Sequence, residues 1–411
     1  MVVPASMSVF SRVCFFRGGG LSLNSAPEHR RPPVLRCCNA SLITNPDSFE
    51  VGRLIGSYGF LNVTSYSGWQ SSGDVEFSVP DAGRLRVQDV GEGDVKIRLY
   101  EGRIVQGPLR RTPVILKVYP GQQVGGIEAD LMAANELSAH SSLQVISKAK
   151  VCQNIQILLG GFETKTGEQW LAFRNDGKYT AADYAKVTSE KLSKGREDGD
   201  QNSWNPYAKD ELFKRRRKYV AKLFQGAMRG LAYMHDHDRL HQSLGPVSVG
   251  VNTIFEKEAP YLVPQLRDLA FSVDIRYSEL SEHSMLSEGL WRRATAAGAF
   301  TPLDKRAFGI ADDIYEAGLL LAYLAFVPFC ETGVMDSLSL RRRLENTFQL
   351  DIEAMREYCV ADDSLVEVVK FLDLDDRAGW ELLQAMLNRD FRQRPIAEAV
   401  LNHRLLTGSL V

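Results

Sequence analysis

The sequence has no strong excess of either charge and no clustered cysteine pattern. Its 411 residues contain 49 Lys and Arg against 51 Asp and Glu, which leaves a net charge of −2. A dedicated nucleic-acid-binding protein is normally basic overall, so this near-balance argues against nucleic acid as a partner. The chain has six cysteines, and no two are spaced as Cys-x-x-Cys. That pattern excludes a disulfide scaffold and argues against a zinc ribbon or a thioredoxin-type site.

Long apolar segments are absent too. The longest apolar run covers residues 317–330 and contains Pro328. A helix that spans a bilayer needs about 20 apolar residues. We therefore expect no transmembrane segment and interpret the run as a helix buried in a large domain. Peripheral contact with a membrane surface stays open.

The first 40 residues lack lysine and contain a single acidic residue, Glu28, together with five arginines. An acid-poor start rich in arginine and serine is typical of an organelle transit peptide. We therefore expect residues 1–40 to be removed from the mature protein. The residues before Ala40 are similar to the processing region of plastid precursors, which favours the plastid. A mitochondrial signal and a plain unstructured tail are the alternatives.

Two segments of different pattern follow. Between residues 48 and 173, short β-branched runs such as 114–118 predict strands, and one amphipathic helix is expected over 127–140. From 174 to 408 the pattern is helical, apart from a polar stretch at 188–210 that we interpret as a surface insert. The predicted fold class is therefore α+β, with a small β-rich lobe and a larger helical lobe.

Four motifs, in order, identify the fold more closely. They are residues 112–117, which end in lysine; 230–246, with a Leu-x-Tyr-Met-His helix end; 313–318, of the form Asp-x-Tyr-x-x-Gly; and 381–387, followed by Arg394 and Pro395. Together they resemble the lysine strand, the catalytic-loop region, the central helix and the C-terminal helices of the protein kinase superfamily. The resemblance covers residues 48–406 and implies a bilobal protein-kinase-like fold, for which ATP and Mg²⁺ are candidate cofactors and neither is certain.

Two shorter segments resemble a narrower group. Residues 169–173 (Gln-Trp-Leu-Ala-Phe) and 379–383 (Gly-Trp-Glu-Leu-Leu) are similar to divergent plastid kinases related to the thylakoid state-transition kinases. This resemblance implies a chloroplast protein in the stroma or at the stromal face of the thylakoid. Its partner or substrate would be a plastid protein.

The resemblance assigns two nucleotide-facing charges. Lys117 matches the lysine that holds the α- and β-phosphates of ATP, and Asp268, in an Asp-Leu-Ala sequence, matches the magnesium-binding aspartate. The usual partner of the lysine is a glutamate on the following helix. We choose Glu128, because apolar residues follow it at positions +3 and +4 and would pack inward. Glu136 is the alternative.

The glycine-rich loop that would cover the phosphates is degraded. Residues 55–63 align with the pattern Gly-x-Gly-x-Phe-Gly-x-Val, and Gly56, Gly59 and Val63 are the candidate binding residues. Tyr58 stands at one glycine position, where a side chain limits how closely the backbone approaches a phosphate. The alternative register places the second strand of the lobe at residues 102–107, directly before the lysine strand, and moves Gly56 away from any nucleotide.

The catalytic loop departs most from the family pattern, His-Arg-Asp-Leu-Lys-Pro-x-Asn. After His241, Ser243 stands at the catalytic aspartate position, Gly245 at the lysine position and Ser248 at the position of the metal-binding asparagine. A hydroxyl has no useful basicity at neutral pH, and loss of a positioned base costs about 10²- to 10⁴-fold in rate. Ser243 and Ser248 are thus degenerate site residues, and His241 keeps a packing role. Asn252 replaces the lost asparagine only if the register slips.

Other charged groups are assigned structural roles. Arg394 is expected to pair with Glu288, near the end of the segment that precedes the central helix. The basic run 214–218 is interpreted as a solvated helix face, with a docking site for anionic lipid or an acidic partner as the alternative. The histidines and aspartates of 235–238 are interpreted as a solvated helix end.

These substitutions predict a pseudokinase, or a catalytically impaired kinase, that binds ATP or no nucleotide and acts by regulation or scaffolding. The alternative is an active serine/threonine kinase that transfers the γ-phosphate of ATP to a plastid protein. The retained Lys117 and Asp268 favour it. A small-molecule or lipid-head-group kinase is a third interpretation, for which the sequence indicates no particular substrate.

Overall fold

The computed structural model describes residues 42–63, 85–89, 95–145, 152–197, 206–276 and 286–408. The chain divides into two compact units. The first contains residues up to 58, 94–151 and 157–174; the second contains residues 59–93, 152–156 and 175–411. The expected transit peptide, residues 1–40, lies outside the described residues.

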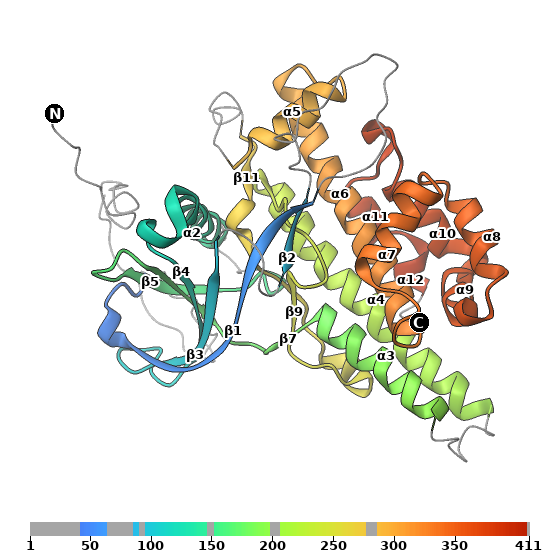
Figure 1. Ribbon diagram of the computed structural model, residues 1–411, viewed down its shortest axis with the longest axis horizontal. Helices are drawn as coiled ribbons and strands as arrows, with labels where there is room; N and C mark the ends of the chain where they lie inside the picture. The colour runs from blue at the N-terminus through green and yellow to red at the C-terminus, as the bar shows by residue number, and fades with distance from the viewer. Residues whose placement is uncertain are drawn as a thin grey trace, which may run out of the picture. The chain divides into compact units, whose positions relative to one another are not determined.

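An antiparallel sheet forms the body of the first unit (Figure 1). Its order is β1-β3-β4-β6-β5, with β1 Phe49–Val63, β3 Ile97–Ile104, β4 Pro113–Tyr119, β6 Gln169–Arg174 and β5 Leu158–Glu163. From Gly59 on, β1 pairs with β2 (Leu85–Asp89). The aliphatic run in β4 is buried on both faces, which places this strand at the centre of the sheet. The strand predicted over 114–118 is confirmed.

The two faces of the sheet bury different side chains. Side chains alternate along a strand, so Val114 and Leu116 share one face of β4, and Lys117 belongs to the other. The face with Val114 and Leu116 packs against an aromatic cluster with ring centroids 5.5–5.8 Å apart. The members of this cluster are Phe49, Tyr100, Phe162 and Trp170. A helix covers the opposite face.

Helix α2 (Gln122–Val145) contacts β4, β5 and β6. It is kinked at Gly126, where φ is 64° and ψ is −171°, a conformation that glycine adopts at no steric cost. Beyond the kink, Ala129, Met132 and Leu137 are buried at helical spacing. The helix predicted over 127–140 is confirmed, although Ile127 itself is exposed.

The second unit is mostly helical (Figure 1). Its long helices are α3 (Ala181–Glu197), α4 (Pro206–Asp236) and α6 (Pro302–Phe326). The shorter ones are α5 (Glu288–Ala296), α7 (Ser337–Arg342), α8 (Ile352–Val360), α9 (Val366–Leu372), α10 (Leu374–Met386), α11 (Ala397–Leu401) and α12 (Arg404–Gly408). Short strands pair as β7 (Tyr179–Thr180) with β9 (Val249–Val251), β9 with β10 (Gln265–Leu266), and β8 (Arg239–Leu240) with β11 (Val273–Asp274).

Helix α6 is the buried centre of the second unit and contacts α4, α5, α7, α9 and α10. It begins at a capping box in which Thr301 and Asp304 satisfy each other's backbone N–H groups. The apolar run that starts at residue 317 lies in its second half, so the interpretation of that run as a buried helix is confirmed. Across the described ranges, no helix combines the length and apolar character needed to cross a bilayer.

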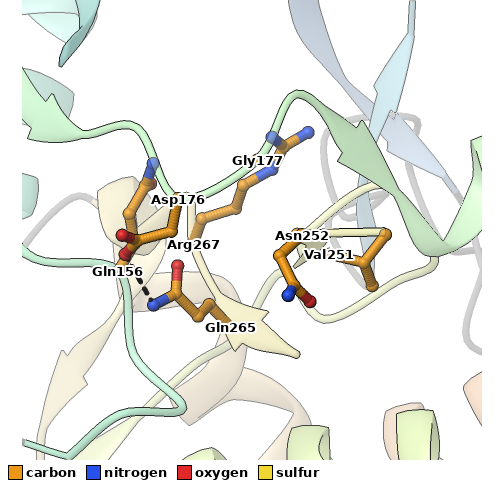
Figure 2. A pocket seen from close by; sticks show the side chains of 8 residues that line it. Gln156, Asp176, Gly177, Val251, Asn252, Gln265 and Arg267 are labelled. Carbon is orange, nitrogen blue, oxygen red and sulfur yellow. Dashed lines mark hydrogen bonds between the residues drawn. The ribbon is translucent and has the colours of Figure 1, made fainter. Parts of the chain in front are cut away.

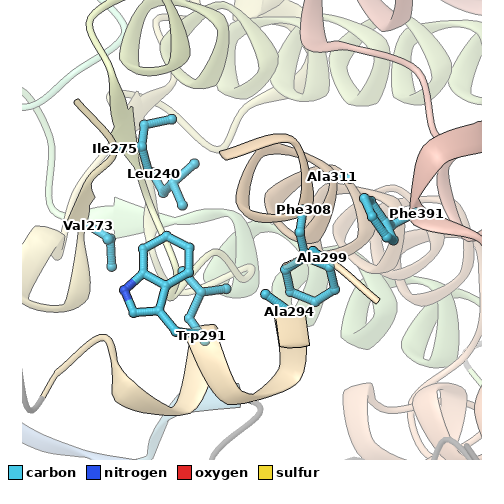
Figure 3. Close-up of a cluster of buried hydrophobic side chains, with 10 residues drawn as sticks. Leu240, Val273, Ile275, Trp291, Ala294, Ala299, Phe308, Ala311 and Phe391 are labelled. Atoms are coloured by element: carbon cyan, nitrogen blue, oxygen red, sulfur yellow. The ribbon is translucent and has the colours of Figure 1, made fainter. Parts of the chain in front are cut away.

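A hydrophobic cluster joins α5 and α6 to the β8–β11 pair (Figure 3). Trp291 of α5 belongs to the same cluster as Leu240 of β8, and Phe308 of α6 packs edge-on against Phe391 with ring centroids 5.2 Å apart. Gly309 permits this approach, because a Cβ there would lie 2.4 Å from the Leu240 side chain. The cluster therefore anchors both strands that flank the loops carrying residues 241–248 and 268.

The described parts of residues 188–210 are helical, whereas their polarity predicted a surface insert. Residues 188–197 are the end of α3, with Thr188 and Ser189 buried, and residues 206–210 begin α4. Residues 198–205 lie outside the described part of the chain. Charged side chains on the exposed face of a helix give the same composition as a loop, which explains the error.

Candidate functional site

Lys117 lies in the central strand of the first unit. Its neighbours across the sheet are Leu99 in β3 and Leu171 in β6, on the face next to α2. The side chain is 3% exposed, and its Nζ lies 2.9 Å and 2.7 Å from the two carboxylate oxygens of Glu136. The carboxylate of Glu136 is 1% exposed. A buried ion pair therefore links the strand to the helix.

Glu136, and not Glu128, is the partner of Lys117. Glu128 lies two residues after the kink at Gly126 and is exposed to solvent. Glu136 lies one turn after Met132, on the buried stripe of α2. The choice of Glu128 was wrong. The apolar residues three and four positions after it lie on or near the buried face of α2, but Glu128 itself lies on the exposed face.

Two tyrosines also lie beside the Lys117 ammonium. Nζ lies 5.6 Å from the ring centroid of Tyr58 and 5.3 Å from that of Tyr119, both within the range of a cation–π contact. The Tyr119 hydroxyl donates to Glu136 Oε2. Tyr58 is 7% exposed and Tyr119 is fully buried. Sequence reasoning placed Tyr58 at a glycine position but missed its contact with the lysine.

The segment predicted as a glycine-rich loop is part of a continuous strand. Gly56 pairs with Leu99, after two register shifts in β1. Gly59 pairs with Asp89, and Val63 pairs with Leu85. Nothing lies within 4 Å of a Cβ built on Gly56, so this glycine is not required by packing.

The alternative glycine region, residues 102–107, serves the packing of the sheet. Gly102 lies in β3, and a Cβ there would lie 2.7 Å from the carbonyl oxygen of Glu50. Gly107, with a φ of 77°, lies in the turn between β3 and β4. β1 and β3 therefore both belong to the sheet, and β3 is the strand directly before the one that carries Lys117.

In the second unit, Asp313 of α6 holds the loop that starts at His241. Its Oδ2 accepts the backbone N–H of His241 at 2.8 Å, and its Oδ1 accepts the backbone N–H of Gln242 at 2.9 Å. Gln242 Nε2 also donates to Oδ1, at 3.0 Å. Gln242 has a left-handed backbone with a φ of 59°, which costs energy that these bonds offset. Asp313 is thus a positioning residue to which sequence reasoning assigned no role.

His235 belongs to the same network. Its Nε2 lies 3.0 Å from Asp313 Oδ2, and the residue is 8% exposed. The interpretation of residues 235–238 as a solvated helix end is therefore wrong for His235. The end of α4 points this ring inward, onto the N-terminal half of α6.

Ser243 is turned into the protein. Its Oγ donates to the backbone carbonyl of Asp268 at 3.0 Å and lies 3.4 Å from His241 Nδ1, and the residue is 5% exposed. His241 is fully buried. Burial lowers the pKa of His241, although the carboxylates of Asp313 and Asp268 act to raise it. A neutral imidazole of this kind packs the loop and is shielded from solvent.

Ser248 is also committed to the loop itself. Its Oγ donates to the Gly245 carbonyl at 2.9 Å and accepts the Gly245 N–H at 2.8 Å. Asn252, considered as a replacement by a slip of register, donates to Tyr261 O at 3.0 Å and accepts the Val263 N–H at 2.8 Å. Both Asn252 groups close the following loop, so the register slip is wrong.

Asp268 has a left-handed backbone, with a φ of 66° and a ψ of 55°. Its neighbour in sequence, Arg267, places Nε 3.5 Å from Asp268 Oδ2, and the two side chains are 16% and 6% exposed. The same Nε donates to the carbonyl of Val247 at 3.1 Å, which fixes the arginine against the loop of residues 241–248. Asp268 therefore has a guanidinium beside its carboxylate.

A small cavity lies beside Arg267, and a larger pocket lies beside the loop of residues 241–248. A polar cavity of about 10 Å³ is lined by Asp176, Gly177, Gln265 and Arg267, among others, with Gln265 Nε2 donating to Asp176 at 3.0 Å (Figure 2). It has room for about one water. A larger pocket of about 220 Å³ lies between the loop at Leu244 and Pro246 and helices α6 and α7, and its lining is mostly apolar.

The remaining charged groups have structural partners. Glu288 is paired with Arg292, at 3.7 Å, instead of with Arg394. Arg394 donates to the carbonyls of Asn388 at 2.8 Å and Ala311 at 3.0 Å. The predicted Arg394–Glu288 pair is therefore replaced by helix contacts and carbonyl contacts.

Within the basic run 214–218, three cations have carboxylate neighbours on the same or an adjacent element. Lys214 pairs with Asp210 at 2.8 Å, Arg215 with Glu211 at 3.0 Å, and Arg216 with Glu256 at 3.3 Å. This local neutralisation favours the helix-face interpretation over a docking site for anions.

Comparisons with known proteins agree with the fold. No protein-family model and no curated protein matches the chain. Among solved structures, the chain is similar to the crystal structure of a Stt7 homolog from Micromonas algae soaked with ATP, with a TM-score of 0.52 and 17% sequence identity. The match covers 94% of this chain and 98% of that one. At this identity the similarity shows the fold, so the predicted α+β, kinase-like class is confirmed.

Proposed function

We propose that this kinase-fold chain is a pseudokinase that regulates or scaffolds a partner protein. The observation that carries the proposal is Ser243, which stands at the catalytic aspartate position and donates its hydroxyl to the carbonyl of Asp268. Phosphoryl transfer needs a carboxylate that orients the acceptor hydroxyl and takes its proton. A serine hydroxyl committed to a backbone carbonyl does neither.

Two further substitutions point the same way. Gly245 brings no charge to the position of the lysine that steadies the γ-phosphate. The Ser248 hydroxyl donates to the Gly245 carbonyl at 2.9 Å and accepts the Gly245 N–H at 2.8 Å, so its oxygen is already hydrogen-bonded within the loop. Phosphoryl transfer depends mostly on positioned charge, and these changes remove stabilisation beyond the missing base.

ATP is the ligand class that we propose for the nucleotide position. Lys117 is retained, and its pair with Glu136 is formed, as an active arrangement in this fold requires. The similar algal structure was soaked with ATP. A nucleotide that binds without being consumed can shift the protein towards one conformation and so regulate a partner.

The proposed compartment is the plastid, either the stroma or the stromal face of the thylakoid. The arginine-rich, acid-poor composition of residues 1–40 and the similarity to an algal protein support it. The partner would then be a plastid protein, and contact with the thylakoid would be peripheral.

An active, atypical serine/threonine kinase is the second candidate. The formed Lys117–Glu136 pair favours it, because a degenerate site under no constraint has no need to keep a buried ion pair. The two candidates differ in a single measurable property, the transfer of the γ-phosphate.

The test is incorporation of label from γ-labelled ATP into the full chain and into a general protein substrate. We expect the wild type to match Lys117→Ala and Ser243→Ala, since there is no transfer for either change to remove. Incorporation by the wild type that is lost in Lys117→Ala would establish the kinase and end the pseudokinase proposal.

A further inference from the structure

The kinase-like fold implies a divalent cation between the aspartate at position 268 and the nucleotide phosphates. Mg²⁺ requires oxygen ligands in near-ideal octahedral geometry, supplied by one or two carboxylates together with phosphates and water. Asp268 is the carboxylate that stands at the metal position in this chain. Ser248, at the other metal position, is bonded twice to Gly245.

Arg267 stands where it competes with such a cation. Its Nε is 3.5 Å from Asp268 Oδ2, and both side chains are largely buried. The guanidinium cannot swing away freely, because Nε also donates to the Val247 carbonyl at 3.1 Å. In Figure 2 the side chain extends away from Gln265 towards the segment of Gly177.

The electrostatics are unfavourable for a divalent ion. A cation bound to Asp268 would lie close to a permanent positive charge, since arginine stays protonated at any physiological pH. Repulsion between charges is stronger where water is excluded, and the Asp268 side chain is only 6% exposed. In the described part of the chain, no group of three or more His, Cys, Asp or Glu residues could hold a metal ion in its place.

We infer that Arg267 takes the place of the magnesium ion at Asp268. On the proposed function, this makes the protein a metal-independent nucleotide binder. The residues around Asp268 do not suit a Mg²⁺ ion, because the Arg267 guanidinium already lies beside the carboxylate. Arginine suits the substituted role, because its planar fork of N–H donors matches a phosphate and its charge balances the carboxylate. The ligand is then free ATP, with Arg267 as the residue that sets this preference.

Calorimetric titration of the full chain with ATP tests this, once with excess EDTA and once with excess Mg²⁺. We expect the wild type to bind equally well or better in EDTA. Arg267→Gln should bind about tenfold more weakly in EDTA, the loss expected for one charge-assisted contact, and should regain affinity with Mg²⁺. Arg292→Gln, an exposed arginine on α5, is the matched control and should behave as the wild type. Binding by the wild type only in Mg²⁺, or an Arg267→Gln variant that is unchanged, overturns the inference.

A second measurement needs no nucleotide. The electron spin resonance signal of Mn²⁺ reports how much ion each variant binds. We expect none bound to the wild type, and weak binding to Arg267→Gln, through the one carboxylate and water, that disappears when Asp268→Asn is added. Mn²⁺ bound by the wild type through Asp268, or none bound by a folded Arg267→Gln, refutes the role of Arg267.

The two measurements separate this inference from the proposed function. If ATP binds under no condition while the Mn²⁺ results hold, the nucleotide part of the proposed function fails and Arg267 keeps its role. If label is transferred from ATP in a Mg²⁺-dependent reaction, both fail. Circular dichroism of each variant confirms that the comparison is between folded proteins.

Discussion

Replacing Glu136 with glutamine is the sharpest test of the buried pair in the first unit. Glutamine keeps the size of the side chain and its helix propensity but removes the charge. Lys117 would then be a buried cation that has lost the carboxylate beside it, since its side chain is 3% exposed and both Glu136 oxygens lie within 2.9 Å of Nζ. Breaking a buried pair in this way costs about 3–5 kcal/mol.

That loss is a large fraction of the stability of a protein, which is typically about 5–15 kcal/mol. Because the chain has two compact units, a single unfolding curve can mix two transitions. We would therefore follow urea unfolding together with hydrogen exchange of peptides from β4 and α2. Protection in both elements should fall in Glu136→Gln.

The exposed Glu128 offers a matched control on the same helix. Glu128→Gln should change the free energy of unfolding by less than about 0.5 kcal/mol, as surface substitutions usually do. Lys117→Met combined with Glu136→Leu should recover most of the loss, because neither charge of this pair is then left buried without the other. Equal effects of Glu136→Gln and Glu128→Gln, or a loss below about 1 kcal/mol for Glu136→Gln, would refute the buried-pair reasoning.

Three further predictions concern the tyrosine, the histidine and a glycine. Tyr58→Ala should raise the rate at which an acylating reagent labels Lys117, measured by peptide mass spectrometry, because the ring now lies 5.6 Å from Nζ; an unchanged rate contradicts this. Burial lowers the pKa of His241 below 6.5, so its stabilisation is present above that pH and is lost as the pH falls through the lowered pKa. The stability deficit of His241→Gln in urea titrations should therefore shrink in acid, and a constant deficit argues against it. Gly177→Ala should cost about 1–3 kcal/mol, as overpacking does. Its Cβ would lie 2.4 Å from the Val251 carbonyl, whereas Gly245→Ala meets nothing within 4 Å and should be neutral in the same thermal unfolding assay.

The fold could be predicted from the sequence because its signals are local and ordered along the chain. The β-branched run before Lys117, the helix end at His235 and the Asp313–Gly318 motif each depend on residues close in sequence. The serine at position 243 could also be recognised from the sequence, because a motif fixes which residue stands at the catalytic aspartate position. The surface insert predicted from the polar stretch at 188–210 did not anticipate the helices there, because composition does not distinguish an exposed helix face from a loop.

The partners of the charged groups were decided only by the tertiary structure. Glu136 rather than Glu128 meets Lys117 because Glu136 lies one turn after the buried Met132, on the packed face of α2, whereas Glu128 is exposed. His235 and Asp313 are 78 residues apart in sequence and meet because helices α4 and α6 pack together. Motif matching assigned no role to Arg267, since the residue before the aspartate belongs to no motif. The sequence alone determined which chemical groups the chain has lost; packing determined what the retained charges are balanced against, because ion pairing depends on distances that the fold creates.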